Sequence, residues 1–202
     1  MRIGILGGTF NPPHLGHLAI AQEAHAPLGL DKVVLLPVFR PPHKPLDDDP
    51  GPEARYELCH LAVAKDDRFA VSRLELDREG PSYTVDTLRT IHAGSPGDDL
   101  TFIVGGDVAQ GLPSWREPEA ILELATVAVA EREGIRRQDI AERVSALPGA
   151  GRLVFFDFPR MDLSSSQIRR RVREGRPIRY LVPDDVARVI GARGYYRPKV
   201  SA

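Results

Sequence analysis

The chain has 202 residues, of which 42% are hydrophobic and 27% charged, a composition typical of a soluble domain that buries a core without disulfide or metal staples. Its 27 Lys and Arg residues balance 28 Asp and Glu residues to a formal charge of −1, which excludes a general attraction to nucleic acid or to an anionic membrane. The single cysteine, Cys59, excludes an intramolecular disulfide, and no apolar run approaches the roughly 18 residues of a membrane span, so we expect a cytoplasmic protein whose thiol is buried and inert.

Short apolar segments alternate with longer amphipathic ones along the chain. Most of the apolar segments lack polar alternation, as expected for parallel strands covered on both faces. The predicted strands are residues 3–6, 33–36, 69–72, 100–104, 126–130 and 153–156. The predicted helices are residues 15–28, 52–64, 84–92, 117–124, 135–147, 165–174 and 184–192.

This alternation predicts an α/β fold with a doubly wound, mainly parallel sheet and helices on both faces. We expect residues 1–202 to form one domain, with a helical portion packed on it from about residue 164. The Pro-, Asp- and Gly-rich stretch 41–52 is expected to be a mobile loop within that domain. Sheets of this kind bind ligands at the carboxyl ends of their strands, near the topological switch point.

A candidate phosphate site follows the first predicted strand. Gly7 and Gly8 let the backbone approach a phosphate closely, and the helix that follows offers unpaired N–H groups. His14 and His17 are three residues apart, so they share one face of the first helical turn and could reach the same phosphate. A glycine pair alone is often only a tight turn, but the combination is more specific. The spacing fits neither the dinucleotide-binding fingerprint nor the P-loop, which argues against hydride transfer and kinase chemistry.

A second candidate phosphate site follows the last predicted strand. Three consecutive serines, residues 164–166, precede a helix, and Arg169 lies one turn inside it. Serine commonly caps helices, so capping alone would account for the pattern. Hydroxyl groups, a positive helix terminus and an arginine also suit a polyphosphate. We expect the neighbouring Arg170, Arg171 and Arg173 to lie on a solvated face.

These two sites resemble the signature of the nucleotidylyltransferase superfamily. The first match is Gly8-x-Phe10-x-Pro12-x-His14-x-Gly16-His17, and the second is the Ser-Ser-x-Ile-Arg element at residues 165–169. The resemblance implies a Rossmann-like fold, catalytic roles for His14, His17 and Arg169, and a grip on the β- and γ-phosphates by Ser165 and Ser166. It also implies further ATP contacts from Gly7, Gly8, Thr9, Phe10, Gly16, Gly105, Asp107 and Arg132.

The middle of the chain is similar to the nicotinate mononucleotide adenylyltransferases. The matching segments are residues 41–44, 81–88, 105–107 and 112–115. The resemblance implies that the tryptophan stacks on the pyridine ring, that backbone amides hold the nicotinate carboxylate, and that the 41–44 segment reaches a phosphate. The residues implied in mononucleotide binding are His43, Lys44, Thr84, Val85, Trp115 and Arg116.

Two departures separate this chain from that family pattern. The family commonly has Asn shortly before Pro-Pro-His, where this chain has Phe39-Arg40, and Arg40 is a candidate replacement for the missing phosphate contact. The family's Arg-Pro-Gly becomes Arg132-Glu133-Gly134, so the position of that loop is open. A third and milder difference is Asn11, where the family often has Asp; both side chains are short and polar.

The resemblance implies transfer of the adenylyl group of ATP to nicotinate mononucleotide, giving nicotinate adenine dinucleotide and pyrophosphate. Mg²⁺ is expected to be bound through the ATP phosphates and water, with no protein ligands. Three alternatives stay open: transfer to phosphopantetheine, a preference for nicotinamide mononucleotide, and a non-catalytic nucleotide-sensing module. We expect ATP and nicotinate mononucleotide as partners and neither nucleic acid nor membrane; the oligomeric state, a homo-oligomer included, is open.

Overall fold

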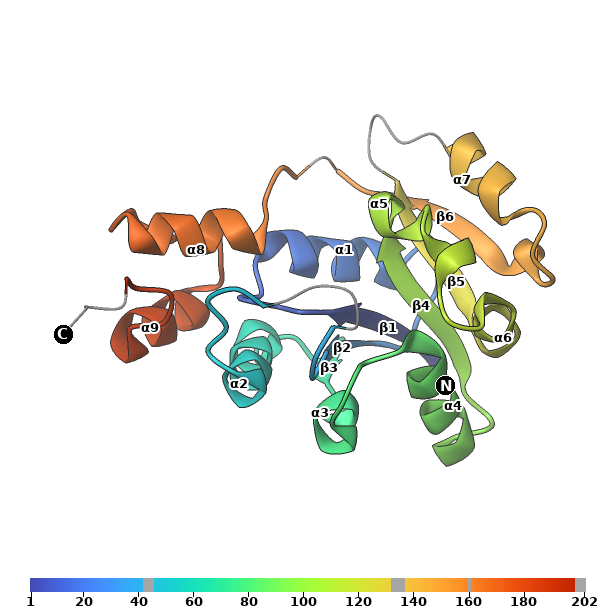
Figure 1. Ribbon diagram of the computed structural model, residues 1–202, viewed down its shortest axis with the longest axis horizontal. Coiled ribbons are helices and arrows are strands. Elements are labelled where there is room, and N and C mark those ends of the chain that lie inside the picture. Colours follow the sequence, from blue (N-terminus) through green and yellow to red (C-terminus); the bar gives the residue numbers. More distant parts are fainter. Residues whose placement is uncertain (42–45, 132–136, 160, 199–202) are drawn as a thin grey trace.

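The computed structural model describes residues 1–41, 46–131, 137–159 and 161–198. Over these residues six parallel strands form one sheet in the order β3-β2-β1-β4-β5-β6 (Figure 1). The strands are β1 (Arg2–Gly8), β2 (Lys32–Pro37), β3 (Phe69–Val71), β4 (Asp99–Gly105), β5 (Thr126–Glu131) and β6 (Leu153–Asp157). The chain winds outward from β1 to β3, returns to β4 beside β1, and then winds outward in the other direction. The predicted doubly wound α/β class is therefore confirmed, with the switch point between β1 and β4.

Helices occupy all seven predicted positions. Their bounds are α1 (Leu15–His25), α2 (Pro52–Val63), α4 (Thr84–Gly94), α6 (Pro118–Leu124), α7 (Arg137–Val144), α8 (Ser165–Arg173) and α9 (Asp184–Arg193). Two short helices, α3 (Leu74–Arg78) and α5 (Gly106–Ala109), and the 3-10 turns Leu112–Ser114 and Ala150–Arg152 were not predicted. The α1 helix ends three residues before the predicted bound, since the chain turns toward Gly29, which has a φ of 58°.

Local signals in the sequence set several helix ends. Pro52 and Pro118 occupy first-turn positions of α2 and α6, where the missing N–H has no partner to lose. Ser164 caps α8 in a reciprocal capping box with Gln167. Gly194 ends α9 in the left-handed conformation, with a φ of 66°.

The sheet carries an apolar core on each face. Along β4, Phe102 and Val104 belong to the core that packs under α4 and α6, whereas Ile103 belongs to the core that packs under α1 and α2. This two-sided burial is the reason that the strands lack polar alternation. Cys59 lies in the second core, fully buried, and burial raises the pKa of its thiol far above the usual range. The expected burial of this thiol is confirmed.

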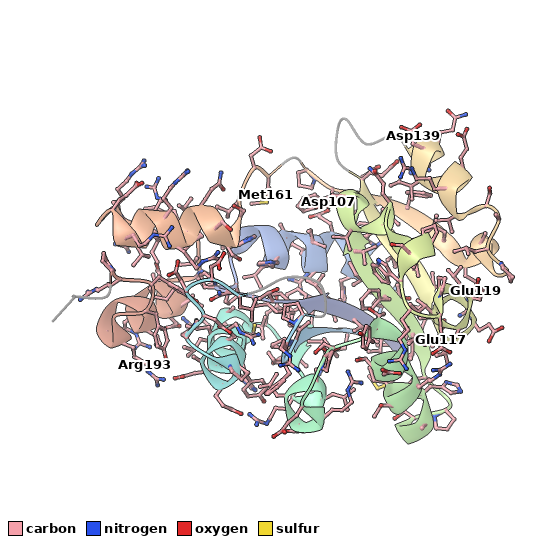
Figure 2. The ribbon with its side chains drawn as sticks, viewed as in Figure 1. Asp107, Glu117, Glu119, Asp139, Met161 and Arg193 are labelled. Atoms are coloured by element: carbon pink, nitrogen blue, oxygen red, sulfur yellow. The ribbon has the colours of Figure 1, made fainter. Side chains whose placement is uncertain are left out.

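The helices α8 and α9 lie together at one end of the molecule (Figure 1). Their apolar side chains form a third cluster that includes Leu58 of α2, Ile168 of α8 and Val186 of α9. Arg193 of α9, labelled in Figure 2, pairs with Glu57 of α2 at 2.7 Å. These contacts bring the start of α8 toward the carboxyl end of β1. In the described part of the chain, no helix combines the length and apolarity needed to span a membrane.

Candidate active site

A cavity of about 440 Å³ opens at the carboxyl ends of β1 and β4, at the switch point of the sheet. We call it the first cavity. It brings together segments from opposite ends of the chain, namely the residues after β1 and the start of α8. The predicted catalytic and ATP-binding residues that line it are Gly7, Thr9, Phe10, His14, Gly16, His17, Gly105, Asp107, Ser165, Ser166 and Arg169.

The glycine pair lies within β1 and not after it, which corrects the expectation. Gly7 pairs with Leu36 and Gly8 with Pro37 in the parallel ladder. A Cβ at Gly8 would lie 3.1 Å from the ring of Phe10, so the absence of a side chain lets that ring fold back against the strand end. Phe10 is itself buried and has a φ of 49°. The chain therefore reverses sharply between β1 and α1.

The two histidines stack against each other at the start of α1. His14 is the residue that precedes the helix and His17 is the third residue inside it, and their ring centroids are 3.7 Å apart at an angle of 25°. The backbone N–H of His14 donates to His17 Nδ1 over 3.1 Å. Neutral His17 therefore carries its proton on Nε2. A Cβ at Gly16 would lie 3.1 Å from the His14 ring, so glycine there leaves room for the stack.

The start of α8 is hydrogen-bonded to the segment between β1 and α1. Ser165 Oγ donates to the carbonyl of Pro12 at 2.8 Å, and Arg169 Nη1 donates to the carbonyl of Asn11 at 2.8 Å. Arg169 Nη2 also donates to Ser166 Oγ at 3.3 Å. Since Ser164 alone supplies the cap, capping does not account for Ser165, Ser166 and Arg169. The two predicted phosphate elements therefore form one site.

The first cavity combines several sources of positive potential. The N-termini of α1 and α8 both lie at it, and the aligned peptide dipoles of each helix make its N-terminus electropositive. The Arg169 guanidinium adds a full charge. Two acidic residues, Asp47 and Asp107, also line it. Figure 2 shows Asp107 on α5 beside the end of β4, and its Oδ1 lies 2.7 Å from where a Cβ at Gly105 would be. Glycine at position 105 therefore allows the carboxylate to fold over the strand end.

A second cavity, of about 310 Å³, adjoins the first. We call it the second cavity. The residues that line both cavities are Gly7, Thr9, Val104 and Val108. Gly8, predicted to contact ATP, lines only the second cavity. The remaining lining of the second cavity is mostly aromatic and apolar, from Val38, Tyr83, Phe102, Trp115 and Ile121.

Trp115 and Arg116 are held in place at the second cavity. The Trp115 ring meets Phe102 edge to face, with centroids 6.0 Å apart. The Arg116 guanidinium lies over the Tyr83 ring at 4.9 Å and pairs with Asp86 at 3.3 Å. One face of the cavity is therefore formed by a fixed aromatic ring.

The α4 helix points its N-terminus at the second cavity. Thr84 lines the cavity as the first helical residue. The Val85 side chain does not line it, because it is fully buried in the core beside Leu88. The backbone N–H groups of both residues lie in the first turn, where no carbonyl of the helix can reach them. The predicted amide donors are therefore at the cavity edge, although Val85 contributes no side chain.

His43, Lys44 and Arg132, three of the predicted binding residues, lie outside the described residues. Arg40, the candidate replacement for a family asparagine, forms an isolated bridge with Pro81 and is exposed. In the described part of the 41–52 loop, Asn11 Nδ2 donates to the carbonyl of Asp47 at 3.3 Å, and Asp47 lines the first cavity.

Sequence reasoning missed two buried charged groups near the cavities. Glu75 of α3 lines the second cavity with 4% exposure and accepts a hydrogen bond from the Thr87 hydroxyl at 2.7 Å. Burial raises the pKa of the Glu75 carboxyl, against the opposing effect of nearby hydrogen bonds and Arg78. Arg55 is 0% exposed and donates to the carbonyl of Thr9. Neither residue stands in a recognisable motif. The one signal in the sequence is the spacing of Arg55, which precedes the apolar Leu58 and Cys59 by three and four residues and therefore shares their face of α2.

Over the described ranges, no cluster of three or more His, Cys, Asp or Glu side chains is arranged to hold a metal ion. The first cavity instead presents imidazole, hydroxyl and guanidinium groups, which are hydrogen-bond donors suited to phosphate oxygens.

Comparison with known proteins adds an independent line of evidence. A family model described as cytidylyltransferase-like matches residues 5–171. A Thermus thermophilus protein named probable nicotinate-nucleotide adenylyltransferase is 47% identical over 197 residues, covering 98% of this chain and 100% of that protein. A Roseiflexus protein of the same name is 46% identical, covering 96% and 98%.

Solved structures share the fold. A Plasmodium falciparum nicotinic acid mononucleotide adenylyltransferase complexed with NaAD superposes with a TM-score of 0.79 at 18% identity, covering 96% of this chain and 97% of that one. A Vibrio parahaemolyticus structure described as a putative nicotinate-nucleotide adenylyltransferase gives a TM-score of 0.71 at 22% identity, covering 100% and 99%. With full-length relatives at nearly half identity and the same sheet, the chain belongs to the nicotinate-nucleotide adenylyltransferase family.

Proposed function

We propose that the first cavity binds ATP, that the second binds nicotinate mononucleotide, and that adenylyl transfer takes place where they join. The products are nicotinate adenine dinucleotide, an intermediate of NAD biosynthesis, and pyrophosphate. The observation that carries this proposal is that Gly7, Thr9, Val104 and Val108 line both cavities, which therefore meet at these residues; we call the four residues the shared wall. Two substrates bound in cavities that meet in this way have their reacting groups next to each other.

On the ATP side, the imidazole, guanidinium and hydroxyl groups of the first cavity neutralise the charge of the triphosphate. His14, His17 and the N-terminus of α1 face the α-phosphate, and Arg169 with Ser165 and Ser166 holds the β- and γ-phosphates. The Arg169 fork already bridges Asn11 and Ser166, so it is pre-positioned. Gly105 and Asp107 then lie where the ribose of ATP can contact them, and Phe10 and Gly16 keep the histidine pair in place.

On the mononucleotide side, recognition combines one ring and several backbone donors. Trp115 stacks on the pyridinium ring, a cationic aromatic that suits an electron-rich indole face. The amides of Thr84 and Val85 at the α4 N-terminus, with the backbone of Arg116, donate to the nicotinate carboxylate. An anionic carboxylate gains more from such donors than a neutral carboxamide, which favours the acid form of the substrate.

The reaction needs no general base, because the attacking phosphate oxygen is already anionic. It forms a bond to the α-phosphorus of ATP while the bond from that phosphorus to the bridging oxygen of pyrophosphate breaks in line. The chain contributes alignment and charge neutralisation. His17 Nε2–H is oriented by the His14 N–H on its other nitrogen, so it donates to the α-phosphate oxygen as charge develops there.

Mg²⁺ fits this site as an ion carried by the triphosphate and water, since the described residues around the first cavity offer phosphate-binding donors and no metal-ligand cluster. When bound, it neutralises part of the polyphosphate charge. We place the enzyme in the cytoplasm, where a single buried thiol such as Cys59 suits the reducing conditions.

The test is pyrophosphate release from ATP and Mg²⁺ with nicotinate mononucleotide, nicotinamide mononucleotide and phosphopantetheine offered separately. Rapid release with the nicotinate form alone supports both the reaction and the acid selectivity. Release only with another acceptor contradicts the assignment of the second cavity. ATP binding without release from any acceptor contradicts catalysis and favours a nucleotide-sensing module.

A further inference from the structure

A fully buried arginine joins the loops from which the two cavities are built. Arg55 of α2 is 0% exposed, and its guanidinium donates four hydrogen bonds. One goes to Asp49 Oδ1 at 3.0 Å. The others go to the backbone carbonyls of Thr9 at 3.0 Å, Val38 at 2.7 Å and Phe39 at 3.0 Å. Arg55 lines neither cavity, so contact with a substrate does not explain it.

The acceptors of Arg55 lie at the junction of the cavities. Thr9 lines both cavities, and Val38 lines the second. Asp49 is two residues beyond Asp47, which lines the first cavity and accepts a hydrogen bond from Asn11. One side chain therefore links three segments of the chain: the residues after β1, the residues after β2 and the residues before α2.

An arginine is the side chain that this arrangement requires. Its planar fork carries five N–H donors that diverge from one group, whereas a lysine has three donors on one nitrogen atom. Burying a charge is costly unless it is paired, and the Asp49 carboxylate supplies the opposite charge. That carboxylate also accepts a hydrogen bond from the N–H of Gly51 at 3.1 Å. Apolar packing often stabilises a fold as well as a buried ion pair does. Stability alone is therefore a weak reason for a guanidinium here.

We propose that Arg55, paired with Asp49, is a positioning residue for adenylyl transfer, because it fixes Thr9 relative to the Val38–Phe39 segment. By holding the shared wall, it sets the distance and angle between the two bound substrates. The inference rests on the proposed function.

The consequence is a separation between binding and turnover. Each cavity keeps its own contacts without Arg55, those of His14 and Arg169 in the first and of Trp115 in the second. Separate binding of each substrate should therefore change little. The chemical step requires both substrates in register, and a misplacement of about 1 Å can lower its rate by about 10²-fold.

The experiment compares Arg55→Lys, Asp49→Asn and a control, Arg73→Lys, with the full-length wild type. Arg73 is a half-exposed arginine in a bidentate pair with Glu53 of α2, and it lines neither cavity. Thermal unfolding, calorimetric binding of ATP alone and of nicotinate mononucleotide alone, and kcat are measured for all four proteins. We expect Arg55→Lys to bind each substrate within about threefold of the wild type and to lose at least about tenfold in kcat. Asp49→Asn should show the same pattern to a smaller extent, and Arg73→Lys should match the wild type.

A wild-type kcat in folded Arg55→Lys, with only a lower unfolding temperature, would overturn the proposal and leave Arg55 a structural residue. Loss of binding affinity with an unchanged kcat would also overturn it. If Arg55→Lys does not fold, Asp49→Asn decides, because it keeps the guanidinium and removes only its counter-charge. Absence of turnover in the wild type would contradict the proposed function itself, and is thereby distinguished from a failure of the Arg55 proposal.

Discussion

The two cavities differ in the kinds of interaction that they can make with a ligand. The first is built from charged and polar groups at two helix N-termini, including His17, Arg169 and Ser165. The second is built from aromatic and aliphatic walls around Trp115, with donors from the backbone of α4. A protein recognises a polyphosphate mainly by its charge, whereas it recognises a nicotinate ring by its flat shape and its single carboxylate. We therefore expect changes in the first cavity to affect the rate of the reaction and changes in the second to affect the choice and affinity of the acceptor.

The largest expected effect comes from His17. His17→Ala should lower kcat by about 10²–10³-fold, because it removes a pre-oriented donor to the charge that develops on the α-phosphate. The KM for nicotinate mononucleotide should change little. His25→Ala, a histidine of the same helix that lines neither cavity, is the control and should behave as the wild type. Steady-state pyrophosphate release measures both variants, and a wild-type kcat in His17→Ala would remove this residue from the mechanism.

The next effect comes from Arg169. Arg169→Lys keeps the charge but loses the fork that bridges the Asn11 carbonyl and Ser166, so kcat/KM for ATP should fall by about 10–100-fold. Arg170→Lys, at the exposed neighbouring position, should leave kcat/KM unchanged. Equal effects from the two variants would show that only the total charge of α8 matters, and would weaken the contrast between the cavities.

A smaller, more selective effect is expected at Trp115. Trp115→Ala should raise the KM for nicotinate mononucleotide about tenfold, since one stacking contact of a ring with an aromatic side chain is worth about 1–3 kcal/mol. The KM for ATP should stay the same, and Trp115→Phe should recover most of the loss because it restores an aromatic face. A parallel rise in both KM values would contradict a separate acceptor cavity.

The smallest effect concerns the buried carboxyl of the second cavity. Burial raises the pKa of Glu75 above the value of 4.5 that an exposed glutamate has, so the stability that its protonated form provides is complete below that value and is lost as pH rises through the folded-state pKa. Glu75→Gln should therefore gain thermal stability relative to the wild type as pH increases from about 4.5 to about 8.

Glu53 is the control for this pH dependence, with the opposite sign. Its hydrogen-bonded pair with Arg73 lowers the pKa of the carboxyl, so its stabilising effect is present above 4.5 and is lost as pH falls. Glu53→Gln should accordingly lose a little stability at neutral pH and none in acid. Thermal unfolding of both variants and the wild type is measured at pH values of about 4.5 and about 8. A difference between Glu75→Gln and the wild type that does not change with pH would contradict the raised pKa of Glu75.

The contrast between the cavities also explains what could be predicted from the sequence. The strands were predictable as short apolar runs without polar alternation, and the long helices as amphipathic patterns of ten or so residues. The residues that line the first cavity could be named from the sequence because glycine, histidine, serine and arginine stand at characteristic spacings around His14 and Arg169. The short helices α3 and α5, with 5 and 4 residues, are too short to show a period.

Other features depend on contacts between distant residues. No motif marks Arg55 or Asp49 in the sequence, and only the fold shows that Arg55 pairs with Asp49 and donates to the carbonyl of Thr9, 46 residues away. Glu75 likewise becomes a cavity residue only because α3 packs against the start of α4. Val85 was predicted on the strength of its backbone, and its side chain turned inward because its position in α4 faces the core.

The most direct test of the central claim is a crystal structure with a non-hydrolysable ATP analogue and nicotinate mononucleotide bound together. We expect the triphosphate between His17 and Arg169, the pyridine ring on Trp115, and the attacking phosphate oxygen in line with the α-phosphorus beside Thr9. A triphosphate in the second cavity, or two substrates whose phosphates do not meet at the shared wall, would contradict it.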